Sequence, residues 1–223
     1  MTGESTIRAV VFDLDGLLVD SEPLQLAAWD RYLERFGVAL TPDLLDRMLG
    51  LRLVDSAKVI VESLDLPVTA EVVMRDRDAI FLASAQGAIR AMPGATALIA
   101  GLRERKVRLG LATSGHRRYV DLALESAGLR GAFDIEVTGE HVERGKPAPD
   151  AYLVAARLLN LPPGRCLALE DAPNGVLSAV SAGMRCIVVP GHVPDAPEFA
   201  LADATVSSLD AVLGALIARG WLD

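Results

Sequence analysis

The most constraining feature of this sequence is an apolar, β-branched run that ends in two aspartates. Residues 10–12 read Val-Val-Phe, and Asp13, Asp15 and Gly16 follow directly. A continuous apolar run is typical of a strand buried on both faces, as in a parallel sheet. Because strand side chains alternate, Asp13 and Asp15 would point to the same face, where an unpaired charge is costly. The pair therefore predicts either an ordinary Asp-Gly turn or a site for a cation or an anion-transfer reaction.

Strand-like and helix-like segments alternate from residue 92 to the end of the chain. This alternation predicts an α/β fold, a Rossmann-like parallel sheet with helices on both faces, to which the strand at residues 10–12 also belongs. We expect further strands at residues 107–113, 135–138, 166–170, 186–189 and 204–206, and helices at residues 95–105, 118–127, 150–159, 175–182 and 209–219.

Residues 20–91 show helical periodicity and no convincing strand. Ser21 is the expected N-cap of a first helix, and further helices are expected from Thr41, over 55–64 and over about 70–89. We therefore expect an all-helical domain, residues 20–91, inserted into an α/β core formed by residues 1–19 and 92–223. Connecting segments near residues 18–20 and 91–94 would act as hinges.

Charge and cysteine content narrow the possible partners and compartments. A net charge of −8 argues against binding to nucleic acid or to anionic membranes. No apolar run approaches the roughly 20 residues that span a bilayer, and residues 1–5 do not resemble the start of a secretory signal. Cys166 and Cys186 fall in expected strands, and we interpret them as buried thiols in a reducing cytoplasm.

Several polar residues follow strands of the expected sheet. Ligands of such sheets bind at the carboxyl ends of the strands, which deliver Asp13, Asp15, Thr113–Gly115, Lys146 and Glu170–Asp171 to one edge. Taken singly, these residues have ordinary explanations as a turn, a helix cap, a surface lysine or a capping carboxylate pair. Their convergence on one edge favours a functional site.

The residue types at this edge suit phosphoryl transfer. Clustered carboxylate oxygens are good ligands for Mg²⁺. A carboxylate can attack phosphorus to give an aspartyl-phosphate if a metal and Lys146 neutralise the approaching charges while Thr113 and backbone N–H groups hold the phosphoryl oxygens. A second carboxyl two residues on can protonate the leaving oxygen and then accept a proton from water.

Other motifs do not match. Residues 139–146 have one residue too many between their glycines for a phosphate-binding P-loop, and Pro147 stands where Ser or Thr is needed. Ser114 lacks the flanking glycines of a nucleophile elbow. The three histidines, His116, His141 and His192, are scattered, and we interpret each as structural or at the surface, with His116 nearest the expected site.

Together, these residues resemble the motifs of the haloacid dehalogenase superfamily over nearly the whole chain. Asp13-Leu14-Asp15-Gly16 is similar to the first motif, Thr113 to the second, Lys146 to the third and Glu170–Asp171 to the fourth. The helical insert resembles the small C1-type cap of the branch that contains β-phosphoglucomutases and phosphoglycolate phosphatases. Residues 20–23, 145–150 and 169–175 also look like that branch.

The resemblance implies a role for each matching position. Asp13 would be the nucleophile and a metal ligand, and Asp15 the general acid/base, with its backbone carbonyl on the metal. Asp171 would be the third protein ligand of Mg²⁺. Glu170 would contact the metal through a water molecule or would hydrogen-bond to the groups that bind it. Thr113 and Lys146 would bind the transferring phosphoryl group. We expect further substrate or phosphate contacts from Gly16, Glu22, Arg52, Ser114, Gly115 and Asn174, although Arg52 could equally be a surface arginine.

Three functions remain open within this resemblance, whereas Asp15 argues against dehalogenation because dehalogenases lack this second aspartate. Residues 23–26 lack the cap histidine typical of the mutases, which favours a phosphatase. Residues 49–53, 188–190 and 207–209 look like sugar-phosphate and hexitol-phosphate phosphatases. We therefore expect a cytoplasmic Mg²⁺-dependent phosphatase, a monomer or weak homodimer, acting on a small phosphorylated metabolite such as a sugar or sugar-alcohol phosphate. A phosphosugar mutase and a non-catalytic binder of phosphorylated ligands are the alternatives.

Overall fold

A six-stranded parallel sheet forms the centre of the protein, as seen in a computed structural model that describes residues 7–191 and 195–222. The strand order is β5-β4-β1-β6-β7-β8, and β1 pairs with β4 on one side and β6 on the other. This order confirms the predicted Rossmann-like α/β fold. The strands are β1 (Ala9–Phe12), β4 (Arg108–Ala112), β5 (Ile135–Val137), β6 (Cys166–Glu170), β7 (Arg185–Val188) and β8 (Ala204–Thr205).

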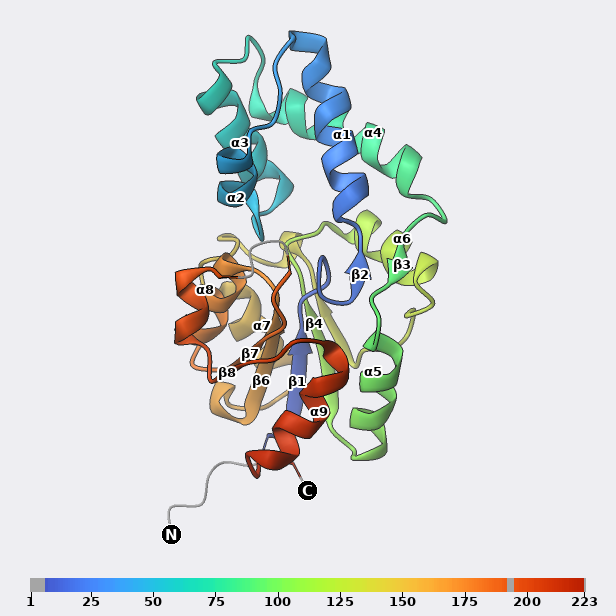
Figure 1. Cartoon of the computed structure of the whole chain (residues 1–223), viewed down its shortest axis with the longest axis vertical. Coiled ribbons are helices and arrows are strands. Elements are labelled where there is room, and N and C mark those ends of the chain that lie inside the picture. Colours follow the sequence, from blue (N-terminus) through green and yellow to red (C-terminus); the bar gives the residue numbers. More distant parts are fainter. Residues whose placement is uncertain (1–6, 192–194, 223) are drawn as a thin grey trace.

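Helices cover both faces of this sheet (Figure 1). Val10 and Phe12 of β1 pack into one apolar core, and Ala9 and Val11 pack into a second core on the other face. This alternation explains why the strand reads as continuously apolar. The first core receives α5 (Ala95–Glu104), α6 (Arg117–Ser126) and α9 (Leu209–Ala218), and the second receives α7 (Asp150–Leu158) and α8 (Pro173–Ser181).

The helices between β1 and α5 form a unit at one end of the sheet, which we call the cap (Figure 1). They are α1 (Glu22–Leu33), α2 (Pro42–Met48), α3 (Leu53–Leu64) and α4 (Ala70–Ala85). Trp29, Tyr32, Ile60 and Val73 lie in an apolar core that belongs to the cap. Near the C-terminal end of α4, Phe81 and neighbouring apolar residues pack instead into the first of the two cores of the sheet, the one that receives α5, α6 and α9.

Two features of the cap differ from the sequence prediction. The chain enters and leaves it through a short antiparallel pair, β2 (Val19–Asp20) and β3 (Arg90–Ala91), which is too short to produce a periodic pattern. Helix α4 ends at Ala85 rather than near residue 89 because Gly87 adopts a positive φ of 67°, which a continuing helix cannot accommodate. No helix within the described residues is long and apolar enough to cross a membrane.

Candidate active site

The carboxyl ends of the central strands open into a cavity of about 640 Å³ between the sheet and the cap. Core residues on its wall include Asp13, Asp15, Thr113, Ser114, Gly115, Glu170 and Asp171, and cap residues on its wall include Glu22, Arg52, Arg77 and Asp78. The structure thus brings together most of the residues singled out in the sequence. Lys146 lies behind this wall and is almost wholly buried.

Three buried carboxylates form a cluster at the base of this cavity. Oxygens of Asp13, Glu170 and Asp171 lie within 4.8 Å of one another. Nζ of Lys146 donates to Oδ1 of Asp13 and to Oε1 of Glu170, each at 2.5 Å. The hydroxyl of Tyr152 donates to the same Glu170 oxygen, also at 2.5 Å. Glu170 is therefore held in place by two donors.

The charge balance of the cluster fits a bound divalent cation. Within residues 7–191 and 195–222, Lys146 is the only cation paired with these three carboxylates. Burial raises the pKa of Glu170 to about 7, and burial followed by the charge of Asp13 raises the pKa of Asp171 well above its usual range. Burial alone would lower the pKa of Lys146, but the Asp13 and Glu170 carboxylates raise it. Oxygen donors with excess negative charge are what Mg²⁺ requires.

Asp15 lies in a different environment from the cluster. Its Oδ1 accepts hydrogen bonds from the hydroxyls of Ser21 and Tyr119. Burial, and then the neighbouring charge of Asp13, raise the pKa of Asp15 to about 6. Ser21 stands at the N-cap position of α1 as expected, but its hydroxyl contacts Asp15 rather than the backbone of the helix. The two aspartates therefore face separate sets of partners, which suits separate chemical roles.

Gly16 has a packing role that differs from the expected phosphate contact. Its φ is +75°, and a Cβ there would lie 2.2 Å from Oδ2 of Asp171. Its N–H donates to the carbonyl of Val19 at 3.0 Å, so this donor is already used within the turn. The glycine allows the turn after β1 to pass close to Asp171.

Thr113 and Gly115 form a turn at the end of β4. Oγ1 of Thr113 accepts from the N–H of Gly115 at 3.0 Å, and both residues line the cavity. Their contacts with phosphate stay a prediction. Ser114 is turned to the cap instead, where its hydroxyl donates to the carbonyl of Gly50 at 2.7 Å.

Two other expected substrate contacts also join the cap to the core. Nδ2 of Asn174 donates to the carbonyl of Leu49 at 2.7 Å. Arg52 pairs with Asp55 at 2.7 Å, and its Nη1 donates to the carbonyls of residues 142 and 143, at 3.2 and 3.0 Å. Arg52 still lines the cavity, but its contacts are within the protein. Sequence reasoning missed these contacts because it could not place the loop at residues 49–52 against the core.

Arg77 of α4 is a cavity residue that the sequence analysis did not single out. Its guanidinium lies 4.9 Å from the ring centre of Trp29 and 5.1 Å from that of Phe81. Nη2 donates to the carbonyl and side-chain oxygens of Gln25, at 2.7 and 2.5 Å. Nε is buried without a hydrogen-bond partner among the described residues, and burial lowers the pKa of Arg77 to about 10. An arginine in line with the buried residues Val73 and Phe81, at helical spacing, was the available signal.

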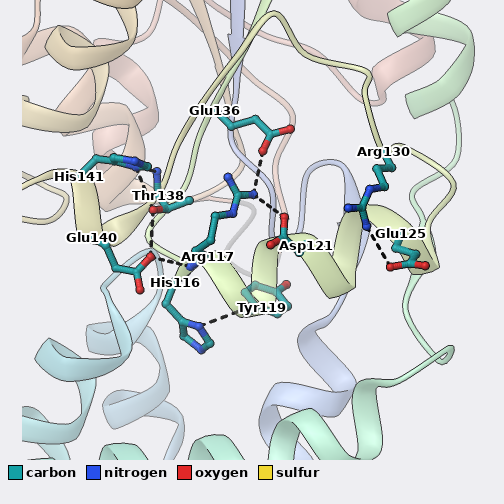
Figure 2. Close-up of polar contacts among 10 residues, drawn as sticks. All are labelled: His116, Arg117, Tyr119, Asp121, Glu125, Arg130, Glu136, Thr138, Glu140 and His141. Carbon is teal, nitrogen blue, oxygen red and sulfur yellow. Dashed lines mark hydrogen bonds and ion pairs between the residues drawn. The ribbon is translucent and has the colours of Figure 1, made fainter.

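Figure 2 shows the start of α6, where two faces of the helix have different partners. The guanidinium of Arg117 lies between the carboxylates of Glu136, at 2.8 Å, and Asp121, at 3.1 Å. His116 and Tyr119 lie on the other side of the helix. His116 lines the cavity, so it lies near the site as expected.

The other histidines are less informative. His141 forms a local pair with Thr138, in keeping with a structural role (Figure 2). His192 lies outside the described residues.

The sequence and fold of this chain are similar to those of a group of known hydrolases. A family model described as haloacid dehalogenase-like hydrolase matches residues 7–183. The chain is 36% identical to hexitol phosphatase A of Escherichia coli over 207 residues, which are 92% of this chain and 93% of that protein. It is 39% identical to a probable pseudouridine-5'-phosphatase of Drosophila melanogaster over 189 residues, 81% of this chain and 80% of that protein. The crystal structure of CbbY from Rhodobacter sphaeroides in complex with phosphate matches with a TM-score of 0.81 and 29% identity, covering 93% of this chain and 96% of that one.

Proposed function

Because this chain belongs to the haloacid dehalogenase-like hydrolases, we propose that it hydrolyses a small phosphomonoester, a sugar or sugar-alcohol phosphate, through attack by Asp13. The observation that carries the proposal is the separation of two carboxylates two residues apart. Asp13 lies in the Lys146-paired cluster, whereas Asp15 is held by hydroxyl donors. Hexitol phosphatase A of Escherichia coli, a relative over nearly the whole chain, supports the choice of substrate class.

Hydrolysis of the phosphomonoester would proceed in two steps. An oxygen of Asp13 attacks phosphorus, the bond from phosphorus to the ester oxygen breaks, and that oxygen takes a proton from Asp15. Water then attacks the phosphorus of the aspartyl-phosphate and gives a proton to Asp15, which releases inorganic phosphate and restores the Asp13 carboxylate. With a pKa near 6, Asp15 is suited to give and take this proton near neutral pH.

Residues of the cluster fit the role of a magnesium site. Asp13 and Asp171 would supply carboxylate ligands and Asp15 its backbone carbonyl, with Glu170 beside them. When bound, Mg²⁺ neutralises negative charge on the phosphoryl group and on the carboxylates. Lys146 contributes to the same neutralisation, while the hydroxyl of Thr113 and the N–H of Ser114 would hold the phosphoryl oxygens, since the N–H of Gly115 already donates to Thr113.

The cap would supply the contacts with the leaving group. We place the domain boundaries at residues 19/20 and 91/92, with the β2–β3 pair as the hinge region. Closure over the cavity would exclude bulk water from the reaction. Arg77 lines the cavity wall and is our choice for a hydrogen bond from its guanidinium to a hydroxyl oxygen of the leaving group. The proposed setting is the cytoplasm, as a monomer or weak homodimer.

A phosphate-release screen over sugar and sugar-alcohol phosphates with Mg²⁺ tests the proposal. We expect release by wild type and none above background by Asp13→Asn. The exposed residue Asp43 provides a control, since Asp43→Asn removes the same charge from the surface of α2. No release from any phosphomonoester, with phosphate binding intact, would favour a non-catalytic binder. An isomerised sugar phosphate with little free phosphate would favour a mutase.

A further inference from the structure

Tyr119 connects the cap to the acid/base side chain. Its hydroxyl donates to Oδ1 of Asp15, and its ring packs edge-on against Phe81 of α4, with ring centres 5.2 Å apart. Both rings are buried. One side of Tyr119 therefore contacts the carboxyl that the mechanism uses, and the other contacts the cap.

A second contact between α6 and α4 keeps this pair aligned. Nε2 of His116 lies 3.0 Å from Oδ1 of Asp78, and Nδ1 of His116 accepts from the N–H of Tyr119 at 3.3 Å. Asp78 and Phe81 are three residues apart on α4, as are His116 and Tyr119 on α6. Residues at this spacing share one face of a helix, so the two contacts lie side by side.

The hydrogen bonds to Asp15 also determine which of its oxygens carries a proton. Ser21 and Tyr119 both donate to Oδ1, which leaves Oδ1 as an acceptor. When the carboxyl is protonated, its hydrogen must therefore reside on Oδ2. Asp15 lines the cavity, and Oδ2 is the oxygen that these two donors leave for the leaving group.

We propose that Tyr119 is a positioning residue, held by Phe81 of the cap, that orients Asp15 so that Oδ2 protonates the leaving oxygen. This inference rests on the proposed phosphatase function. It makes proton donation depend on the packing of α4 against α6. The sequence around Asp15 does not reveal this dependence, because Tyr119 and Phe81 are distant from Asp15 in the chain.

The inference predicts an effect that varies with the leaving group. An alkoxide from a sugar alcohol is a poor leaving group and needs the proton, whereas 4-nitrophenolate is stable without one. Tyr119→Phe should therefore lower kcat/KM, which reports on formation of the aspartyl-phosphate, by about 10- to 100-fold for sorbitol 6-phosphate or for the fastest alkyl phosphate of the screen, the loss of one hydrogen bond to a charged group. Its kcat/KM for 4-nitrophenyl phosphate should change less than about threefold, because that step needs no proton from Asp15.

Tyr152→Phe is the matched control. It removes a buried hydroxyl that donates to Glu170 in the carboxylate cluster, so it should affect both substrates by a similar factor. Phe81→Leu should shift the alkyl-to-aryl ratio in the same direction as Tyr119→Phe, because it removes the ring contact from the cap side. Thermal melts of all variants separate these effects from loss of folding.

Equal losses on both substrates for Tyr119→Phe, or no loss on the alkyl phosphate, would overturn the inference and leave the phosphatase function standing. Phosphate release from neither substrate by wild type would overturn the proposed function, and the inference with it.

Discussion

Replacement of Gly175 by alanine should destabilise the protein through a group that belongs to the active site. Gly175 lies in α8, where a Cβ would be 1.9 Å from Oε2 of Glu170 and 2.0 Å from its Cδ. An ordinary contact needs about 3.4 Å or more, so the carboxylate would have to move by more than about 1 Å. It is buried and held by Lys146 and Tyr152, so this movement breaks both contacts.

The magnitude follows from these two contacts. Each is a hydrogen bond to a charged group, worth about 1.5–3 kcal/mol, so their loss costs about 3–6 kcal/mol. Alanine gains at most about 1 kcal/mol over glycine from helix propensity. The free energy of unfolding should thus fall by about 2–5 kcal/mol, a large fraction of the usual 5–15 kcal/mol.

Gly214→Ala provides a control with the opposite sign. Gly214 lies in helix α9, and among the described residues no heavy atom outside its chain neighbours and the adjacent helix backbone lies within 4 Å of the position of its Cβ. The same substitution there should raise the free energy of unfolding by about 0.5–1 kcal/mol. Urea unfolding followed by circular dichroism measures both. A Gly175→Ala protein within about 1 kcal/mol of wild type, with an unchanged m-value, would refute the reasoning.

Other predictions test the cap, the metal site and the thiols. Arg77→Gln should raise KM for sugar-alcohol phosphates by about tenfold, the value of one charged hydrogen bond, with a much smaller change for 4-nitrophenyl phosphate, and equal changes would count against the leaving-group contact. Asn174→Ala removes one bond to the cap carbonyl of Leu49 and should raise KM about two- to tenfold with kcat nearly unchanged, so a kcat effect alone would contradict a role in closure. Removal of divalent metal with excess EDTA should abolish phosphate release, and Mg²⁺ should raise the melting temperature of wild type but not of Asp171→Asn, where an equal rise in the variant would place the ion elsewhere. Burial raises the pKa of the Cys166 thiol to about 11 and that of Cys186 further, so neither should react with a thiol reagent at pH 8 until the protein is unfolded, and rapid labelling of the native protein would disprove their burial.

The sheet and its edge could be predicted because their signals are local. An apolar run between turn residues indicates a buried strand, and parallel strands bring their carboxyl ends to one edge whatever their order. Asp13, Glu170 and Asp171 could therefore be grouped from the sequence. Their proximity needs no knowledge of the cap.

Residues whose partners come from the cap could not be predicted in the same way. Arg52 was expected to contact the substrate, and the structure shows that its guanidinium also donates to carbonyls of the core. Arg77 and Tyr119 were not identified from the sequence. Their surroundings depend on how α4 and the loop at residues 49–52 sit over the sheet. Helical periodicity shows which face of a helix is buried but not which surface buries it.

The β2–β3 pair makes the cap a candidate for exchange between proteins. Val19 lies opposite Ala91 and Asp20 opposite Arg90, so the chain leaves the core and returns to it at one point. A foreign helical segment whose ends are spaced like two paired strands, about 5 Å apart, could be spliced in without moving β1 or α5. The graft would need an apolar residue where Phe81 meets Tyr119, and a partner for His116 where Asp78 stands. The grafted segment would then determine substrate preference, while the core of the recipient protein would still supply the nucleophile and the carboxylate cluster around it.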